Sequence, residues 1–174
     1  MRSTFLICCI LVLALSSLTC TLEDSLSPPA ISYTEAEAEE LIIVLVNDER
    51  QQFDLPTLSE DALLTSLAKE HSTSMVEYNF FSHDRYPGER SLSYNQPPGT
   101  IRGENLSKTP TRRLIPDPYL SLQEVCEWTV SGWMESPGHR ENIVESRYNE
   151  TGVGVSVSEG GKYLYITQIF EGSY

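Results

Sequence analysis

Capping boxes and apolar spacing predict three long helices in this 174-residue chain. Thr34-Glu-Ala-Glu37 and Ser121-Leu-Gln-Glu124 are both capping boxes, in which a Ser or Thr and a Glu three residues later satisfy the first free amides of a helix. They predict helices that end near Gln52 and Glu135. Ser59 is predicted to cap a helix between these two. The apolar stripe of that middle helix has helical spacing and includes one His: Leu64, Leu67, Ala68, His71 and Met75.

Several residues in these helices are given structural interpretations. Residues 41–46 are all apolar, which predicts a first helix buried on most sides. The polar residues 47–50 that follow are interpreted as a solvated or salt-bridged last turn. His71 lies on the core-facing stripe, where a hydrogen-bonded structural His is favoured over a ligand. Trp128 and Trp133 are interpreted as packing residues.

The last part of the chain alternates apolar and polar residues with the period of a β-strand. Residues 151–158 and 163–170 are predicted strands, joined by a hairpin turn at Glu159-Gly-Gly-Lys162. Residues 101–106 are predicted to form a short extended segment between two loops. Because the strands come mostly at the end of the chain, parallel β-α-β units are disfavoured. The order favours the α+β class, with helices packed on an antiparallel sheet.

The N-terminal segment is typical of an exported protein. Residues 1–20 are interpreted as a signal peptide, since the apolar run at 5–15 is too short to span a bilayer comfortably. A lipoprotein-type leader with lipid attached at Cys20, or an uncleaved membrane anchor, are the alternatives. Residues 21–33 are predicted to be a flexible tether, and residues 34–174 the folded domain. Each alternative predicts a domain that is secreted or held on the outer face of a membrane.

The charge of the chain limits the classes of partner to expect, and its cysteine content limits the disulfides. A formal net charge of −13 argues against nucleic acid and anionic lipid surfaces as partners, but an apolar lipid ligand stays open. Contact with a membrane is expected only through the leader or a lipid anchor. Three of the four Cys lie in the leader, so no disulfide framework is expected. Cys126 lies within a predicted helix, which favours a small buried hydrophobe over a nucleophile.

Three polar residues stand out by their local context. His83 follows an aromatic pair, Glu104 follows Gly103, and His139 begins a short predicted helix capped by Ser136. A carboxylate can hold an imidazole in one tautomer, and two imidazoles with an open position can hold zinc. The spacing of these residues matches no short-spaced zinc signature. No Gly-x-Ser-x-Gly elbow marks a serine nucleophile.

Six segments, taken together and in this order, resemble the signature segments of the CAP superfamily, the cysteine-rich secretory, antigen 5 and pathogenesis-related-1 proteins, also called SCP-domain proteins. The resemblance runs from about residue 38 to residue 171, and the segments are Leu45-Val-Asn-Asp-Glu-Arg50, Ala68-x-x-His-Ser-x-x-Met75, Phe80-Phe-Ser-His83, Gly103-Glu-Asn105, Trp133-x-x-Ser-Pro-Gly-His-Arg-x-Asn-Ile143 and Gly152-Val-Gly154. The scarcity of Cys is similar to the shorter, cysteine-poor branch found in prokaryotes.

The resemblance implies an α-β-α sandwich with a central antiparallel sheet between helical layers. It also implies a cleft with two His and two acidic residues, in which the two His bind zinc in some members. By motif, His83, Glu104 and His139 are three of these four residues. The second acid of the family falls at Ser136 here. Glu135 is the candidate in its place, although one residue turns a helix by about 100°.

The resemblance leaves three functions open. We expect a secreted or surface-tethered CAP-domain protein that acts as a non-enzymatic binding module for a lipid, a small molecule or a cell-envelope partner. The alternative is a zinc-dependent hydrolase or peptidase, in which His83 and His139 hold the metal and Glu104 or Glu135 orients water. In the third, the His and Glu residues form a purely structural hydrogen-bonded network.

Overall fold

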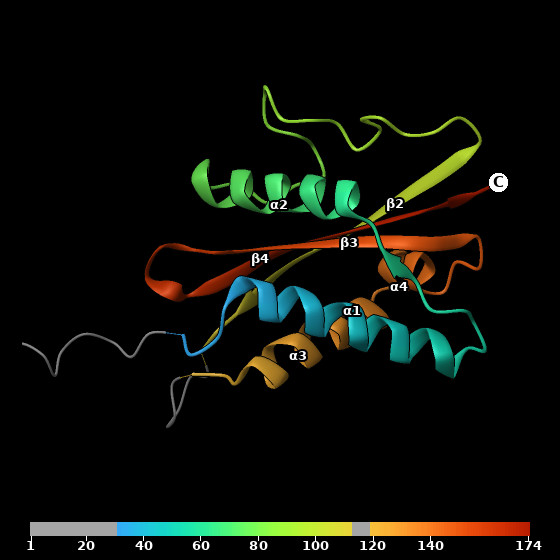
Figure 1. Cartoon of the computed structure of the whole chain (residues 1–174). Helices are drawn as coiled ribbons and strands as arrows, with labels where there is room; N and C mark the ends of the chain where they lie inside the picture. The colour runs from blue at the N-terminus through green and yellow to red at the C-terminus, as the bar shows by residue number, and fades with distance from the viewer. Residues whose placement is uncertain (1–30, 113–118) are drawn as a thin grey trace, which may run out of the picture. The chain divides into compact units, whose positions relative to one another are not determined.

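A computed structural model describes residues 31–112 and 119–174 of the chain (Figure 1). The predicted leader and the tether up to residue 30 lie outside these ranges. The helices are α1 Glu35–Gln52, α2 Ala62–Glu77, α3 Leu122–Glu135 and α4 Pro137–Ile143. The strands are β1 Ser59–Glu60, β2 Thr100–Pro110, β3 Tyr148–Val157 and β4 Tyr163–Ser173, and a 3-10 turn Glu159–Gly161 joins the last two. Within the described ranges, no helix combines the length and apolarity needed to cross a membrane.

Local sequence signals located two of the three long helices correctly. Both predicted capping boxes, at Thr34 and Ser121, are closed, and α1 and α3 end at the predicted residues. The prediction for Ser59 is wrong, because Asp61 caps α2 with its side chain. Ser59 instead pairs in parallel with Glu150 of β3. A capping preference is local, and here pairing with a distant strand overrides it.

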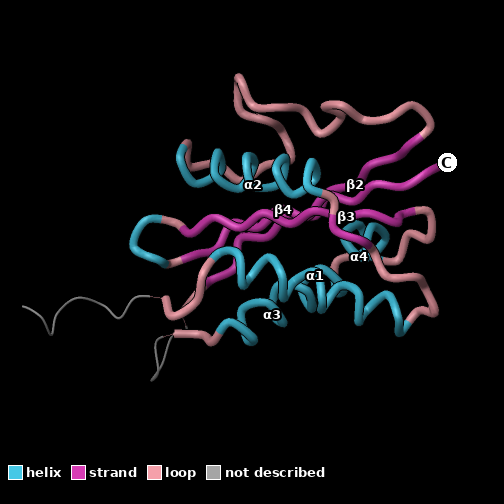
Figure 2. Tube along the Cα trace, in the orientation of Figure 1, coloured by secondary structure: helices cyan, strands magenta, loops and turns pink. Residues whose placement is uncertain are grey.

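The sheet has the strand order β1-β3-β4-β2. The hairpin of β3 and β4 is antiparallel, as predicted. β2 pairs antiparallel with β4 along its whole length, so it reaches Pro110 and is longer than the predicted segment. Figures 1 and 2 show α2 on one side of the sheet and α1 with α3 on the other. The predicted α+β sandwich is confirmed, although the short parallel β1 makes the sheet mixed rather than wholly antiparallel.

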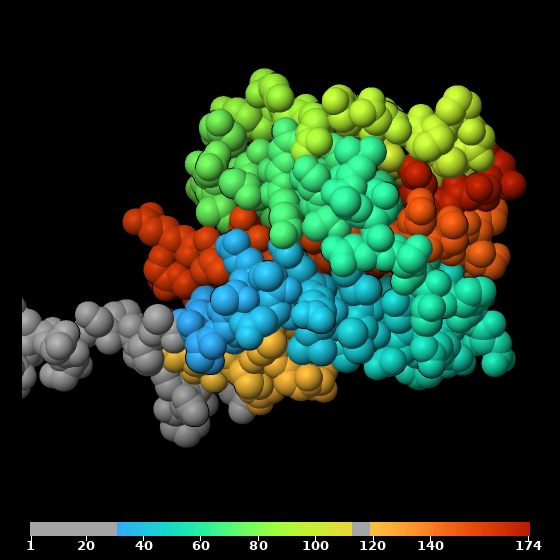
Figure 3. Space-filling model, viewed as in Figure 1, coloured from blue at the N-terminus to red at the C-terminus, as the bar shows by residue number. Residues whose placement is uncertain are grey.

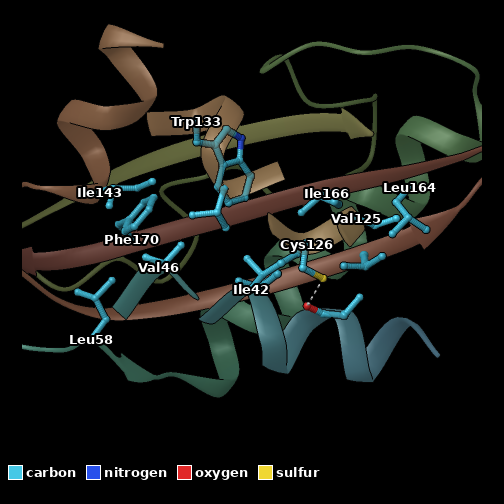
Figure 4. Packing of buried hydrophobic residues seen from close by; sticks show 14 of the residues in the cluster. Ile42, Val46, Leu58, Val125, Cys126, Trp133, Ile143, Leu164, Ile166 and Phe170 are labelled. Carbon is cyan, nitrogen blue, oxygen red and sulfur yellow. Dashed lines mark hydrogen bonds between the residues drawn. The ribbon is translucent and has the colours of Figure 1, made fainter. Parts of the chain in front are cut away.

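Large apolar side chains fill the space between the sheet and the helices α1 and α3 (Figure 4). Ile42 and Val46 are fully buried there, but Val44 of the same apolar run is 49% exposed. Leu41, Ile43 and Leu45 are partly buried against the same cluster, so the prediction that this run is buried on most sides is confirmed except at Val44. Cys126 is fully buried, and burial raises the pKa of its thiol to about 12. This confirms its interpretation as a buried hydrophobe.

Arg50, at the end of α1, is fully buried rather than solvated as predicted. Its guanidinium donates to the backbone oxygens of Pro56 (2.9 Å), Ile143 (2.8 Å), Glu145 (2.9 Å) and Tyr148 (3.0 Å). Burial lowers the pKa of this guanidinium. Because three of these carbonyls belong to residues 143–148, from the end of α4 to the start of β3, Arg50 fixes where α4 sits against α1.

On the opposite face, α2 lies almost in backbone contact with β3. A Cβ added at Gly152 would lie 2.0 Å from the amide nitrogen of Thr65, and one added at Gly154 would lie 2.2 Å from that of Lys69. Loop 81–99 covers the outer side of α2 (Figure 3). α2 is thus held against β3, and the loop that carries His83 follows α2 in the chain. This loop therefore starts next to the sheet.

Candidate functional site

The structure brings two of the predicted site residues into direct contact. Glu104 lies in the middle of β2 with a buried side chain, and His83 lies in the loop after α2. The His83 Nδ1 atom is 3.0 Å from Glu104 Oε1, and the His83 side chain is 59% exposed. A buried carboxylate therefore orients an imidazole whose other face is open to solvent.

Two further residues join this pair and were missed by the sequence analysis. The Arg85 guanidinium donates to the second carboxylate oxygen of Glu104, and its Nε lies 3.5 Å from Glu89 Oε1. Glu89 in turn lies 2.7 Å from Nδ1 of His71. The side chains of Arg85 and Glu89 are both largely buried. They occur in a loop without apolar periodicity, so no sequence signal marked them.

His71 joins the loop to α2 through both ring nitrogens. Its Nδ1 faces the Glu89 carboxylate, and its Nε2 lies 2.9 Å from the backbone oxygen of Ser82. The ring is fully buried and packs edge-on against Phe80, with centroids 6.0 Å apart. The prediction of a hydrogen-bonded structural His is confirmed. Two hydrogen bonds from one ring hold both ends of the segment that carries His83.

His139 reaches the site from the first turn of α4. Burial, and then the nearby charge of His83, lower the pKa of its imidazole. Its backbone oxygen accepts from Asn105 Nδ2 (3.0 Å), and Asn142 Nδ2 donates to the Glu104 backbone oxygen (3.2 Å). Hydrogen bonds thus link α4 directly to β2, so the Glu104 and His139 segments are held at a set distance.

Gly103 makes the close approach of these segments feasible. A Cβ at this position would lie 2.5 Å from the Tyr148 hydroxyl and 2.7 Å from Asn142 Oδ1. No other residue type fits at that distance without moving its neighbours. The Gly in the Gly103-Glu-Asn105 segment therefore serves the contact between β2 and α4.

Glu135 is not brought to this cluster. It is exposed at the end of α3 and lines a neighbouring hollow together with Glu127 and Trp128. In the described part of the chain it makes no hydrogen bond or ion pair with the other three predicted site residues. The helix places Ser136, not Glu135, with His139 in the wall of a separate groove between β2 and α3.

The donor set around His83 and His139 stops short of a catalytic zinc site. In the residues that the structure describes, no group of three or more His, Cys, Asp or Glu side chains could hold a metal ion. Both carboxylate oxygens of Glu104 are already engaged, one by His83 and one by Arg85. Catalytic zinc takes three protein ligands. Zinc bound by His83 and His139 stays a prediction.

A groove of about 390 Å³ runs between β2 and α3, next to His139. Residues 106–110 of β2 form one side, and α3 contributes Trp128, Gly132 and Trp133 to the other. Its volume falls within the range of about 300–1,000 Å³ typical of small-molecule pockets. A Cβ added at Gly132 meets nothing within 4 Å, so this Gly leaves the groove open.

The two Trp residues of α3 have different surroundings. Trp133 is buried and its indole Nε1 donates to the Leu106 backbone oxygen (2.9 Å), which confirms its interpretation as a packing residue. Trp128 is 53% exposed on the rim of the groove, so its interpretation as a packing residue is wrong. Phe81, 49% exposed, also lines the groove. The period of a helix does not reveal which apolar residue the neighbouring elements leave uncovered.

Solved structures share this fold. An extracellular protein containing an SCP domain from Bacillus anthracis str. Ames has a TM-score of 0.63 and 26% sequence identity, over 83% of this chain and 44% of that chain. An outer surface protein from Borrelia burgdorferi has a TM-score of 0.62 over 82% of this chain and 97% of that chain. At 15% identity, the second likeness shows the fold alone.

Sequence comparisons identify the family. Uncharacterized protein YkwD of Bacillus subtilis (strain 168) is 31% identical over 117 residues, which are 67% of this chain and 41% of that protein. The chain spans less than half the length of the curated relatives it matches. A family model described as "CAP: Cysteine-rich secretory protein family" matches residues 43–170, a range that includes His83, Glu104 and His139. The chain therefore belongs to the CAP family of cysteine-rich secretory proteins.

Proposed function

We propose that the protein is a non-enzymatic binding module that works outside the cytoplasm and receives its ligand in the groove between β2 and α3. One observation carries the proposal: two large aromatic side chains, Trp128 and Phe81, are about half exposed on a groove that ends at His139. Exposed aromatic side chains in a concave, mostly apolar site are typical of ligand pockets. A ligand with an apolar group fits, whether a lipid, a small molecule or a cell-envelope component.

The similarity to an extracellular SCP-domain protein supports the proposed location. The leader-like composition of residues 1–20 agrees with it. Release into the medium and attachment through lipid at Cys20 are distinguished by mass spectrometry of the mature N-terminus. A lipid-modified Cys20 would establish a surface-tethered form.

The groove is tested with the fluorescent probe 1-anilinonaphthalene-8-sulfonate, titrated into the full chain. Gly132→Leu fills the open space at that position, and we expect it to weaken probe binding by at least about tenfold without loss of folding. Val44→Leu enlarges an exposed apolar residue of α1 outside the groove and is the matched control. Equal binding by the unaltered chain and Gly132→Leu would contradict the proposal.

The zinc-dependent hydrolase remains the alternative, and one observation favours it. Burial, and then the nearby charge of His83, lower the pKa of His139, which favours the neutral imidazole that binds a metal. Zinc per chain is measured after dialysis for the unaltered chain, His83→Ala and His139→Ala. About one zinc, lost in both variants, would support this alternative. No zinc above background would leave His83, Glu104 and His139 as a hydrogen-bonded scaffold.

A further inference from the structure

The outer edge of β2 is open where it borders the groove. β2 ends the strand order, and no strand of the described ranges pairs with its other edge. Two backbone bonds, Thr111 N to Lys162 O (3.0 Å) and Tyr174 N to Gly99 O (3.1 Å), show that the odd-numbered residues bond to β4. The even-numbered residues of β2 therefore point their N–H and C=O groups outward, away from β4.

Helices α3 and α4 form hydrogen bonds with only some of the outward backbone groups of β2. The outward carbonyl of Glu104 accepts from Asn142 Nδ2 (3.2 Å), and that of Leu106 accepts from Trp133 Nε1 (2.9 Å). The next outward groups are the N–H and C=O of Lys108 and the C=O of Pro110, and no described residue bonds to them. Both residues line the groove. Unpaired edge groups of this kind form a template for another strand.

Aromatic side chains lie on both sides of this open edge. Phe81 stands edge-on to Tyr165 (6.2 Å between centroids), whose ring lies 4.8 Å from the Lys108 ammonium. These three belong to the α2 side of the sheet. Trp128 is on α3, on the opposite side. A strand that continues the sheet here would send alternate side chains to the Lys108 side and to the Trp128 side.

We infer that this edge of β2 binds an extended peptide segment of a partner protein, which adds to the sheet as a further strand. This inference rests on the proposed function and names the class of its ligand. The peptide residue opposite Lys108 exchanges two backbone hydrogen bonds with it, and a third bond reaches the Pro110 carbonyl. The side chain of that residue lies beside the Lys108 ammonium, and its two neighbours in the peptide face Trp128.

Charge decides the chemistry of the peptide. Lys108 is exposed at the groove, so an acidic side chain opposite its ammonium forms a complementary cross-strand pair. Apolar residues on either side of the acidic one match the exposed indole of Trp128. The sequence pattern that fits is therefore apolar, acidic, apolar, in an extended conformation.

Three labelled peptides test the inference on the full chain: Thr-Val-Glu-Val-Thr, the same peptide with Lys in place of Glu, and the Glu peptide with a methyl group on its Glu amide. Binding is followed by ¹⁵N NMR at the Lys108 amide and by fluorescence anisotropy. We expect the Glu peptide to shift and protect the Lys108 amide. The N-methyl peptide, which cannot donate to the Lys108 carbonyl, should bind about tenfold more weakly.

A charge swap provides the matched variant. In Lys108→Glu, the preference should reverse, so that the Lys peptide binds about three- to fivefold more tightly than the Glu peptide. Lys108→Pro removes the outward N–H, which an edge strand tolerates, together with the side-chain ammonium, and should weaken the Glu peptide. Equal binding of the N-methyl and unmethylated peptides would overturn the inference. So would a dimer of the free chain, seen by sedimentation, that excludes the peptide.

The two proposals fail in distinguishable ways. If no peptide binds but Gly132→Leu still blocks 1-anilinonaphthalene-8-sulfonate, the groove is a ligand site and the peptide inference is wrong. If neither probe binds, the proposed function itself is wrong. If the Glu peptide binds and protects the Lys108 amide, both are supported.

Discussion

The two faces of the sheet are packed by different means. Large apolar side chains such as Ile42, Trp133 and Phe170 fill the face under α1 and α3 (Figure 4). Under α2, smaller apolar clusters are combined with the glycines Gly152 and Gly154, where a helix backbone comes within van der Waals distance of β3. Packing of large side chains stabilises the face under α1 and α3, whereas the close approach of two backbones stabilises the face under α2.

The difference matters for the site, because each face positions one part of it. α2 leads directly into the loop with His83, so the α2 face determines how that imidazole meets Glu104. α3 and α4 carry Trp128 and His139, so the other face determines the groove. The candidate site lies where the two kinds of packing meet on β2.

The largest expected effect comes from a side chain placed between α2 and β3. In Gly154→Val, the new Cβ would lie 2.2 Å from Lys69 N and 2.3 Å from Ala68 C, which are backbone atoms that no rotamer change can move. We expect a loss above about 4 kcal/mol in the free energy of unfolding, measured by urea denaturation.

The control for this change is Gly132→Ala in α3, where open space surrounds the added methyl group. Helix propensity should stabilise that variant by about 0.5–1 kcal/mol. Similar small effects from both substitutions would mean that α2 is not seated against β3 as described.

Shortening a buried side chain on the face under α1 and α3 tests how much the buried side-chain volume stabilises that face. Ile166 is fully buried in the cluster between the sheet and α1 with α3. Ile166→Ala should cost about 2–5 kcal/mol of unfolding free energy, and Ile166→Val about 0.5–1.5 kcal/mol, because the cavity grows with the atoms removed. If both variants lost the same unfolding free energy, the neighbouring side chains would have moved to fill the cavity.

Buried hydroxyl groups on the α2 face predict a smaller effect. The Ser72 hydroxyl lies 2.9 Å from both the Gly154 carbonyl and Thr167 Oγ1. Ser72→Ala should lower the unfolding free energy by about 1 kcal/mol, because it leaves buried polar groups with one partner fewer. Adding Thr167→Val should cost less than the two single changes combined. Strict additivity in this double-mutant cycle would argue against a direct bond.

The smallest expected effect is a pH dependence centred on His139, where the two parts of the site meet. Burial and the charge of His83 lower its pKa in the folded state from the ordinary value of 6.5. The unfolded chain therefore takes up this proton first as the pH falls, so stability should decrease as the pH drops below about 6.5. His139→Gln should remove this part of the slope.

NMR titration of the three imidazoles measures the pKa of His139 directly. The pKa of His139 should lie below 6.5 and should rise in His83→Gln, which removes the neighbouring charge. A value at or above 6.5 in the unaltered chain would contradict the partly buried position of the His139 side chain.

Prediction from the sequence succeeded where the signal is local. The capping boxes located α1 and α3, and the alternation of apolar residues located the β3–β4 hairpin. It was wrong where distant segments decide the outcome. Ser59 has the sequence context of a helix cap but pairs with β3, and Arg50 has that of a solvated helix end but bonds to carbonyls of residues 143–148.

The site shows the same division. Resemblance to the family marked His83, Glu104 and His139, and the structure joins His83 to Glu104 directly. Arg85 and Glu89 complete that network, but a polar loop has no period from which their burial could be inferred. Glu135 was a candidate by sequence position alone, and the turn of α3 places it in another hollow.

The sequence by itself determined the helices, the hairpin, the α+β class and the family, because capping, period and motif depend on neighbours along the chain. Only the tertiary structure decided which polar residues meet and which surfaces stay open. Trp128 and Trp133 lie on one helix, yet one is buried against β2 and the other faces solvent. Burial depends on the element that packs opposite, and in this chain that element is β2, which pairs with β4 along its whole length.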